Sequence, residues 1–197
     1  MTIKAQDVKE LREKTGLGMM ECKKALEEAN GNLEEAIKNL RKSSALKAEK
    51  KASRTAVEGI IISKISDNEI TFVEVNCETD FVAKDENFIN FCEEVLKVAV
   101  DTPSKENLLD EVSESMEKQR MSLVQKIGEN IIIRKVKKIT GEVLDSYIHS
   151  NKKIAAGVSL DQGSPEIAKE IAMHIAASNP VVLSPEDLDE SYINSER

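Results

Sequence analysis

The spacing of apolar residues over positions 3–42 predicts three short helices. The first ends at Gly16, whose lack of a side chain permits a tight turn. The second covers positions 19–29 and is followed by Asn30-Gly31, a common C-terminal signal of helices. Asn32 can cap the third helix, because a Glu follows three residues later as in a capping box. The pattern therefore predicts a small three-helix module at the N-terminus.

Residues 43–54 have a different composition from the module that precedes them. The segment holds Lys47, Lys50, Lys51 and Arg54 against Glu49, with Ala between them and no Pro. This composition predicts an exposed linker, for which a helix is one form. Two interpretations stay open: a solvated cationic linker, or a docking strip for an acidic partner.

From Gly59 onward the periodicity changes to that of strands. The β-branched segments 60–62 and 70–75 flank a polar turn and predict a hairpin. Asp85 is a candidate N-cap for an amphipathic helix that Pro103 closes. This segment therefore has the order strand, turn, strand, helix.

The same order recurs from Gly141 to Ser178, so we expect a duplicated ββα unit. Between the two units, a polar helix is expected to end at Gly128, and residues 131–133 are typical of a buried strand. Strands and helices in separate runs predict an α+β fold with antiparallel sheets.

Charge and aromatic content exclude several functions. The chain has 197 residues, with 28 Lys and Arg against 36 Asp and Glu, and a formal net charge of −8. Only 3% of residues are aromatic, too few for a platform on which bases stack. Affinity for the phosphate backbone needs clustered cations, so direct binding of nucleic acid is not expected.

Cysteine and histidine usage gives no indication of a metal site, a cofactor or an enzyme. The three cysteines form no CxxC pair, which argues against disulfides and zinc and favours the cytoplasm. No apolar segment suggests a leader or a membrane span. A small hydrolase would need a nucleophile paired with a base, and the motifs of such pairs are missing around His149 and His174.

One aromatic residue does not fit the pattern of a core. All four phenylalanines fall within residues 72–91, and Phe72, Phe88 and Phe91 fit a strand or helix facing the core. Phe81 lies in the connection between them. Connections lie at the surface and often carry function. Phe81 is thus either a wedge presented to a partner or a lid folded back on the local core, and the turn near Gly128 is either a second exposed edge or an ordinary junction.

Several of these segments resemble bacterial elongation factor Ts, in family order along the chain. The segments are VKELREKTGLGMMECKKAL at 8–26, NCETDFV at 76–82, KIGENI at 126–131 and HIAAS at 174–178. The first two are long and specific. The resemblance covers essentially the whole chain, and long family members continue beyond it into a helical protrusion and further core. We therefore expect a family architecture that lacks its C-terminal part.

The resemblance implies a division of the chain into four segments. Residues 1–54 would form a module similar to ubiquitin-associated domains together with the basic linker, and residues 55–140 the N-subdomain of the core. Residues 141–181 would begin the C-subdomain, and residues 182–197 the protrusion. Family members can form homodimers through the second subdomain, and a shortened chain is expected to do so less readily.

The resemblance also implies a guanine-nucleotide exchange factor that speeds GDP release from elongation factor Tu, without covalent chemistry. The loop matching Thr79, Asp80, Phe81, Val82, Ala83 and Lys84 would insert near the partner's magnesium site. Further partner contacts would come from Arg12, Met19, Met20, Lys23, Lys51, Ile127, Gly128, Asn130 and His149. A ribosome- or RNA-associated module that uses the basic strip 41–54 remains the alternative.

Overall fold

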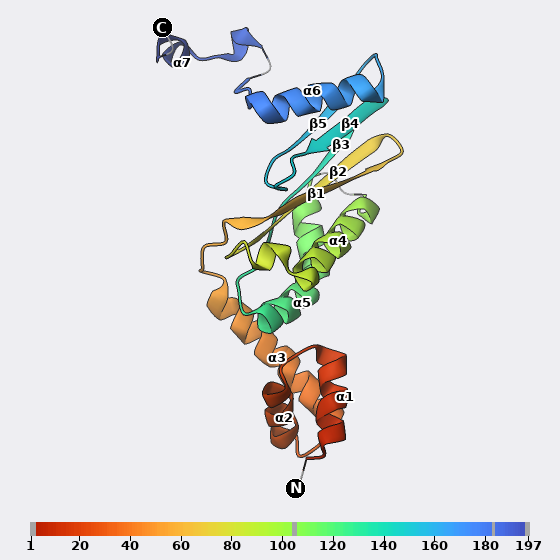
Figure 1. Cartoon of the computed structure of the whole chain (residues 1–197), viewed down its shortest axis with the longest axis vertical. Coiled ribbons are helices and arrows are strands. Elements are labelled where there is room, and N and C mark those ends of the chain that lie inside the picture. The colour runs from red at the N-terminus through yellow and green to blue at the C-terminus, as the bar shows by residue number, and fades with distance from the viewer. Residues whose placement is uncertain (1–2, 104–105, 183, 196–197) are drawn as a thin grey trace. The chain divides into compact units, whose positions relative to one another are not determined.

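The computed structural model describes residues 3–103, 106–182 and 184–195. The chain, whose helices and strands are labelled in Figure 1, divides into two compact units. Unit 1 consists of the residues up to Lys64 together with Thr71–Lys138. Unit 2 consists of Ile65–Ile70 and the residues from Ile139 onward. The β1–β2 turn therefore belongs to the second unit, although the bodies of both strands belong to the first.

The three predicted helices of the N-terminal module are confirmed. They are α1 (Ala5–Thr15), α2 (Met19–Glu28) and α3 (Leu33–Lys51). Gly16 caps α1 in a left-handed conformation, with φ of 67°, and Asn32 caps α3 by accepting a hydrogen bond from the backbone N–H of Glu35 at 3.1 Å. The helices bury a core of their own: Val8, Leu11, Leu17, Cys22, Ala25, Leu26, Ala29, Ala36 and Leu40.

Residues 43–51 are helical, which is one of the forms expected for the linker, but the expected exposure holds for only part of residues 43–54. Helix α3 continues to Lys51 and packs along helix α5 (Leu108–Ile127). Ser44 and Ala48 are buried on this face, and the Ser44 hydroxyl oxygen lies 2.9 Å from the backbone oxygen of Leu40. Their small side chains allow the two helices to approach closely, which the count of lysines did not indicate.

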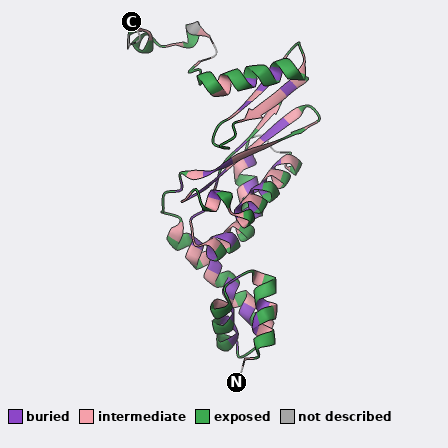
Figure 2. Ribbon diagram, in the orientation of Figure 1, coloured by how far each residue is buried: buried purple, intermediate pink, exposed green. Residues whose placement is uncertain are grey.

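The core of unit 1 is a three-stranded sheet with two helices. Its strands are β1 (Glu58–Ser66), β2 (Glu69–Cys77) and β3 (Ile132–Thr140), and they lie in the order β1-β2-β3. A two-residue turn joins β1 and β2, which requires an antiparallel pair. Helix α5 and helix α4 (Glu86–Asp101) contribute most of the remaining core residues. Figure 2 shows buried and exposed positions alternating along these helices.

The predicted cap and the predicted buried face of α4 are both confirmed. Asp85 caps the helix by accepting hydrogen bonds from the backbone N–H groups of Asn87 at 2.8 Å and Phe88 at 3.3 Å. Phe88 and Phe91 are buried in the core. The assignment of Phe72 to this core is wrong, since its ring is half-buried and lies outside the cluster. The strand pattern placed it on the wrong face because β2 is apolar on both sides.

Unit 2 contains the second ββα unit in the predicted order. Strand β4 (Val143–Ile148) pairs antiparallel with β5 (Ala155–Leu160), and Ser164 caps helix α6 (Pro165–Ser178). Ala168 and Ala172 of α6 are fully buried against this sheet. A short 3-10 helix η2 (Pro185–Asp187) and helix α7 (Glu190–Ser195) follow. The α+β class with antiparallel sheets is therefore confirmed.

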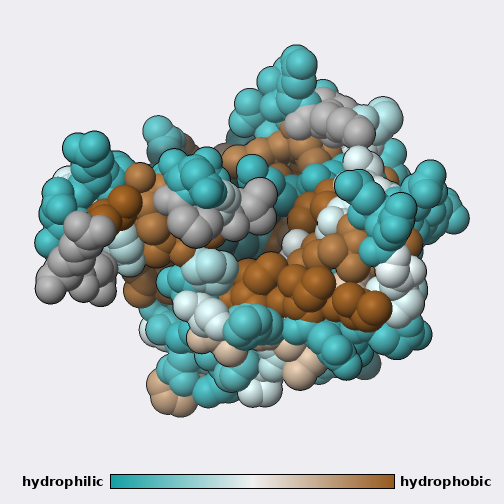
Figure 3. Space-filling model, turned by 90° about the horizontal axis from the view of Figure 1, so that it is seen from above, coloured by the Kyte–Doolittle hydropathy of each residue, from teal (hydrophilic) through white to brown (hydrophobic). Residues whose placement is uncertain are grey.

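Helix α6 keeps apolar side chains on its outer surface. Figure 3 shows a row of hydrophobic side chains across one face of the molecule. The exposed apolar residues of unit 2 include Ile154, Ile167, Ile171 and Met173. His174 is exposed as well, so it does not pack in the core of this unit. None of the helices within the described residues has the length and hydrophobicity to cross a membrane.

Candidate protein-interaction site

Three segments that are distant in the sequence meet at one edge of unit 1. They are the connection 78–85 between β2 and α4, the turn 127–130 between α5 and β3, and the end of α3 at residues 51–54. Hydrogen bonds join each segment to at least one of the others. The structure thus brings together two features that sequence analysis treated separately, Phe81 and the Ile-Gly turn.

The carboxylate of Glu129 anchors the start of the connection. One oxygen accepts hydrogen bonds from the backbone N–H groups of Glu78 and Thr79, both at 3.0 Å. The other oxygen accepts a hydrogen bond from the Thr79 hydroxyl at 2.7 Å. Hydrogen bonds to an ionised carboxylate are stronger than neutral ones, so this contact holds the loop in place.

Glu78 makes the reciprocal contact with the turn. Its carboxylate accepts a hydrogen bond from the backbone N–H of Asn130 at 2.6 Å and lies 3.5 Å from the guanidinium of Arg54. The buried side chain of Asn130 donates to the backbone oxygens of Ala52 at 3.3 Å and Arg54 at 2.8 Å. Asn130 therefore ties the turn to the end of α3, which makes it a structural residue as well as a candidate contact.

The thiol of Cys77 supports the same loop from the core side. Its sulfur donates a hydrogen bond to the backbone oxygen of Thr79 at 3.2 Å. Burial, together with the nearby carboxylates of Glu129 and Glu58, raises the pKa of Cys77 to about 12. The thiol therefore keeps its proton at neutral pH and remains a donor.

Phe81 extends from this anchored loop into solvent, with 81% of its surface exposed. The next residues form a 3-10 helix, η1 (Val82–Lys84), in which Ala83 is buried and Val82 packs against the core. The lid interpretation of Phe81 is therefore wrong, and its ring is free to contact another molecule.

Asp80 is exposed beside Phe81 and pairs with a residue of the same loop. Its carboxylate lies 2.8 Å from the ammonium of Lys84, and both side chains are largely exposed. A hydrogen bond and charge attraction from Asp80 raise the pKa of Lys84. Solvent screens such a pair, so the attraction between Asp80 and Lys84 is weak.

The Ile-Gly turn is joined to α3 as well. Gly128 ends α5 with φ of 91°, a conformation that favours glycine, and its backbone oxygen accepts a hydrogen bond from Lys51. Ile127 is half-buried and packs against the core. Lys51 is thus a residue that orders the turn, and its ammonium is already engaged.

The remaining candidate residues lie elsewhere. Arg12, Met19, Met20 and Lys23 are exposed on α1 and α2 of the N-terminal module, with 58% of Met19 and 74% of Met20 accessible. Their exposure on a small helical module suits a contact surface. His149 belongs to unit 2, where it is exposed and lies edge-on to Tyr147, with the ring centroids 6.4 Å apart.

A polar junction joins the N-terminal module to α5. Glu21 of α2 accepts hydrogen bonds from Lys47 and from the side-chain amide of Gln125, the latter at 2.7 Å. Gln125 in turn accepts a hydrogen bond from Ser44. Partial burial alone would raise the pKa of Glu21, but hydrogen bonds from Lys47 and Gln125 and the charge of Lys47 lower it. Glu21 therefore stays ionised between the two parts of unit 1.

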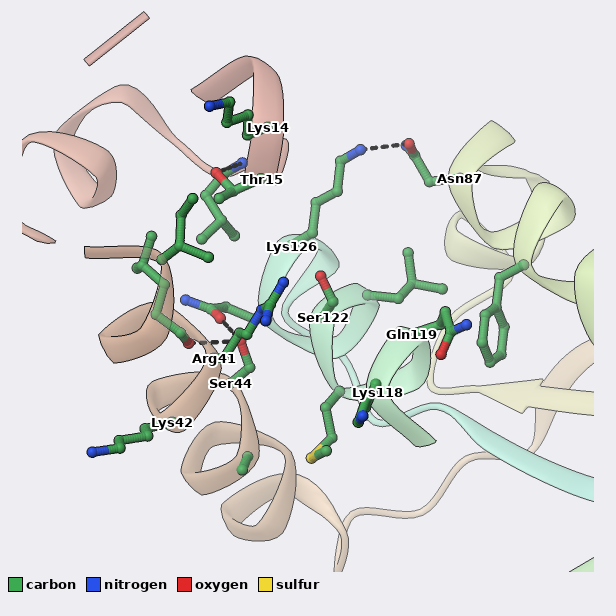
Figure 4. A pocket seen from close by; sticks show the side chains of 18 of the residues that line it. Lys14, Thr15, Arg41, Lys42, Ser44, Asn87, Lys118, Gln119, Ser122 and Lys126 are labelled. Atoms are coloured by element: carbon green, nitrogen blue, oxygen red, sulfur yellow. Dashed lines mark hydrogen bonds between the residues drawn. The ribbon is translucent and has the colours of Figure 1, made fainter. Parts of the chain in front are cut away.

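A groove of about 1120 Å³ lies beside this junction (Figure 4). Residues of α1, α3, α4 and α5 line it, and the cations outnumber the carboxylates. Lys126 crosses one side and donates to the side chain of Asn87 at 2.6 Å. The basic residues that line the groove are Lys14, Arg41, Lys42, Lys118 and Lys126. No local pattern in the sequence predicts this groove, because its lining comes from segments spread over more than a hundred positions.

Sequence analysis also missed the residues that support the loop. Glu78 and Glu129 were not among the candidates, although both lie inside the quoted motifs, and Arg54 was named only as part of the basic strip. Their position in these motifs was the available signal. Within the part of the chain that the structure describes, no group of three or more His, Cys, Asp or Glu residues could hold a metal ion.

Fold and site together define an α+β protein with a helical N-terminal module, duplicated ββα units and an anchored loop that exposes a phenylalanine. The family model "Elongation factor TS" matches residues 78–197. Proteins called elongation factor Ts are similar over nearly the whole chain. That of Marinobacter nauticus is 53% identical and that of Hahella chejuensis 50%, each over 99% of this chain and 68% of the relative.

A third relative, elongation factor Ts of Haemophilus ducreyi, is 48% identical over the same shares of the two chains. This chain belongs to the elongation factor Ts family. The family assignment gives it a role in translation elongation. The chain spans about 68% of the length of these relatives.

Proposed function

We propose that this protein is the guanine-nucleotide exchange factor of elongation factor Tu, and that it promotes GDP release through Asp80 and Phe81. The observation that carries the proposal is the exposed ring of Phe81 on a loop held by hydrogen bonds. A ring that is exposed without being disordered loses little entropy on binding. Membership of the elongation factor Ts family supports elongation factor Tu as the partner.

Phe81 acts as a rigid wedge in this proposal. An aromatic ring has only two side-chain torsions, so it can separate packed elements of a partner at low entropic cost. Bound Mg²⁺ neutralises phosphate charge and anchors the nucleotide, and a disturbed magnesium shell lowers the affinity for GDP. Asp80 is placed to reorganise polar contacts in that shell, since its pairing with Lys84 is exposed and weak.

Additional contacts would hold the partner against the wedge. Met19 and Met20 are exposed apolar side chains on α2, and the cations Arg12 and Lys23 are exposed on α1 and α2 of the same module. Methionine adapts its shape readily and is common on binding surfaces. Ile127 and Gly128 lie at the turn that anchors the wedge loop, and His149 would contribute from unit 2. The proposed partner places this activity in the cytoplasm.

Exchange requires negative coupling between factor and nucleotide. If the factor weakens GDP binding, GDP must weaken factor binding by the same ratio. Binding energy from the module and the turn would offset the cost of distorting the nucleotide site. The loss of Phe81 is therefore expected to reduce the coupling more than the affinity for nucleotide-free partner.

The test is release of a fluorescent GDP analogue from elongation factor Tu. Wild-type chain should accelerate release, Phe81→Ala should lose most of the acceleration, and Phe81→Leu should keep part of it. Met173→Ala is the matched control, because it removes an exposed apolar side chain from unit 2. Equal rates for wild type and Phe81→Ala would overturn the wedge mechanism.

The structure does not favour the alternative of RNA binding through residues 41–54. Most of this strip is helix α3, where Ser44 and Ala48 are buried against α5. Lys47 and Lys51 are engaged with Glu21 and Gly128. Binding of RNA that weakens steeply with added salt would be the result in its favour.

A further inference from the structure

We propose that Glu129 is a positioning residue, which presents Asp80 and Phe81 to the partner by holding the preceding residues of the loop. This inference rests on the proposed exchange function and adds to it a residue that need not touch elongation factor Tu. The geometry also makes a separate prediction about the isolated chain. The two can therefore be tested independently.

The hydrogen bonds of Glu129 all act on the residues directly before the wedge. Its carboxylate accepts from the backbone N–H groups of Glu78 and Thr79, and from the Thr79 hydroxyl at 2.7 Å. Two consecutive backbone groups and one side chain are thereby fixed. These hydrogen bonds therefore fix the direction of the backbone from Thr79 into Asp80.

Thr79 passes this constraint to the other side of the wedge. Its hydroxyl oxygen accepts a hydrogen bond from the backbone N–H of Val82 at 3.4 Å, and its backbone oxygen accepts from that of Ala83 at 3.2 Å. Asp80 and Phe81 thus lie between two anchored points. Phe81 itself is 81% exposed, so its own packing contributes little to its placement.

Glu78 strengthens the attachment from the opposite direction. Its carboxylate accepts a hydrogen bond from the backbone N–H of Asn130, the residue after Glu129. Each of the two segments thus offers a carboxylate to a backbone donor of the other. Arg54, which is 3.5 Å from Glu78, offsets the repulsion between these two acidic groups. Breaking one contact leaves the other in place, so loss of Glu129 should loosen the loop without unfolding the core.

Loss of Glu129 should lower the apparent affinity of the chain for its partner in the GDP-release reaction. Ordering the backbone of one residue changes an equilibrium constant by a factor of roughly 5–30. We therefore expect Glu129→Ala to raise the concentration of factor needed for half-maximal exchange by about that factor, with a smaller change in the maximal rate. Glu129→Gln retains an acceptor oxygen and should fall between Glu129→Ala and wild type.

The experiment combines exchange kinetics with amide hydrogen exchange of the free chain. In Glu129→Ala, the amides of Glu78 and Thr79 should exchange faster, while those of Val73 and Val75 in strand β2 stay protected. Thr79→Val removes only the hydroxyl and should add little to Glu129→Ala in a double-mutant cycle. Glu114→Ala removes an exposed carboxylate from α5 and is the control for charge.

The positioning role would be overturned if the amides of Glu78 and Thr79 exchanged hydrogen faster in Glu129→Ala while the kinetics of GDP release stayed unchanged. Faster amide hydrogen exchange throughout the core in both Glu129→Ala and Glu129→Gln would also overturn it, since Glu129 would then be purely structural. If the wild-type chain does not release GDP from elongation factor Tu, the proposed function fails. The amides of Glu78 and Thr79 would still decide whether Glu129 orders the loop.

Discussion

The carboxylate of Glu78 accepts a hydrogen bond from the backbone N–H of Asn130 at 2.6 Å, and the two residues are 52 positions apart in the chain. This contact joins the connection that carries Phe81 to the turn that ends helix α5. It also makes the exposed loop dependent on a residue beyond α4 and α5. The same contact therefore affects both the stability of the fold and the position of the loop that carries Phe81.

Removal of the Glu78 carboxylate should destabilise the chain. In Glu78→Ala, the backbone N–H of Asn130 loses its acceptor, and an unsatisfied buried donor costs about 1–3 kcal/mol. Urea unfolding, followed by circular dichroism, would measure the change. Glu114→Ala on the exposed face of α5 should change the free energy of unfolding by less than about 0.5 kcal/mol. Equal values for the two variants would show that the contact adds nothing to stability.

Phe81 and Phe88 should differ sharply in their effect on stability. Phe81→Ala removes a ring that is already exposed, so the free energy of unfolding should change by less than about 0.5 kcal/mol. Phe88→Ala empties a fully buried site and should cost about 3–5 kcal/mol. Thermal unfolding of both variants would measure this difference. A large loss in Phe81→Ala would mean that the ring packs in solution.

Glu21 should make part of the stability dependent on pH. Its pKa in the folded chain is lowered from an ordinary value of 4.5 by hydrogen bonds from Lys47 and Gln125 that outweigh partial burial. Because the folded pKa lies below the unfolded one, the stabilisation is present above about pH 4.5 and is lost as the pH falls through the folded pKa.

The measurement for Glu21 is the free energy of unfolding of wild type and Glu21→Gln between pH 3 and pH 7. The difference between the two proteins should shrink as the medium becomes acidic. Glu13→Gln, an exposed carboxylate on α1, controls for the general effect of charge. A difference that is constant with pH would contradict the ionised junction.

Gly59 should tolerate no side chain. Its φ is 139°, and a Cβ placed on it would lie 2.1 Å from the backbone oxygen of Val75 in the neighbouring strand. Backbone atoms cannot give way as a flexible side chain can, so Gly59→Ala should cost more than about 2 kcal/mol. Gly18 has φ of −62° and open space where a Cβ would lie. Gly18→Ala should therefore lower the free energy of unfolding by less than about 1 kcal/mol. Similar urea midpoints would show that β1 and β2 can separate locally.

Local interactions made much of the fold predictable from the sequence. The caps at Asn32 and Asp85, the left-handed Gly16 and the polar turn of the first hairpin each depend on a few neighbouring residues. The periodicity of α4 correctly identified Phe88 and Phe91 as core residues. Such signals act over one or two turns, so the sequence alone carries them.

Packing between distant segments decided what the sequence could not show. The basic strip after Arg41 is helical and half-covered because Ser44 and Ala48 fit against α5. Nothing in the local composition distinguishes this from a solvated linker. The placement of Phe72 outside the core cluster likewise depends on which face of β2 the helices cover.

The amino-acid sequence by itself determined the order of the elements, the α+β class and the two motifs around Phe81 and Gly128, because these depend on neighbours along the chain. Only the tertiary structure decided that Phe81 is exposed and that Glu78 and Glu129 exchange hydrogen bonds between the two motifs. The physical reason is that the partner of a carboxylate is whichever hydrogen-bond donor the fold brings next to it. Here that donor lies some fifty residues away, beyond the reach of any local pattern.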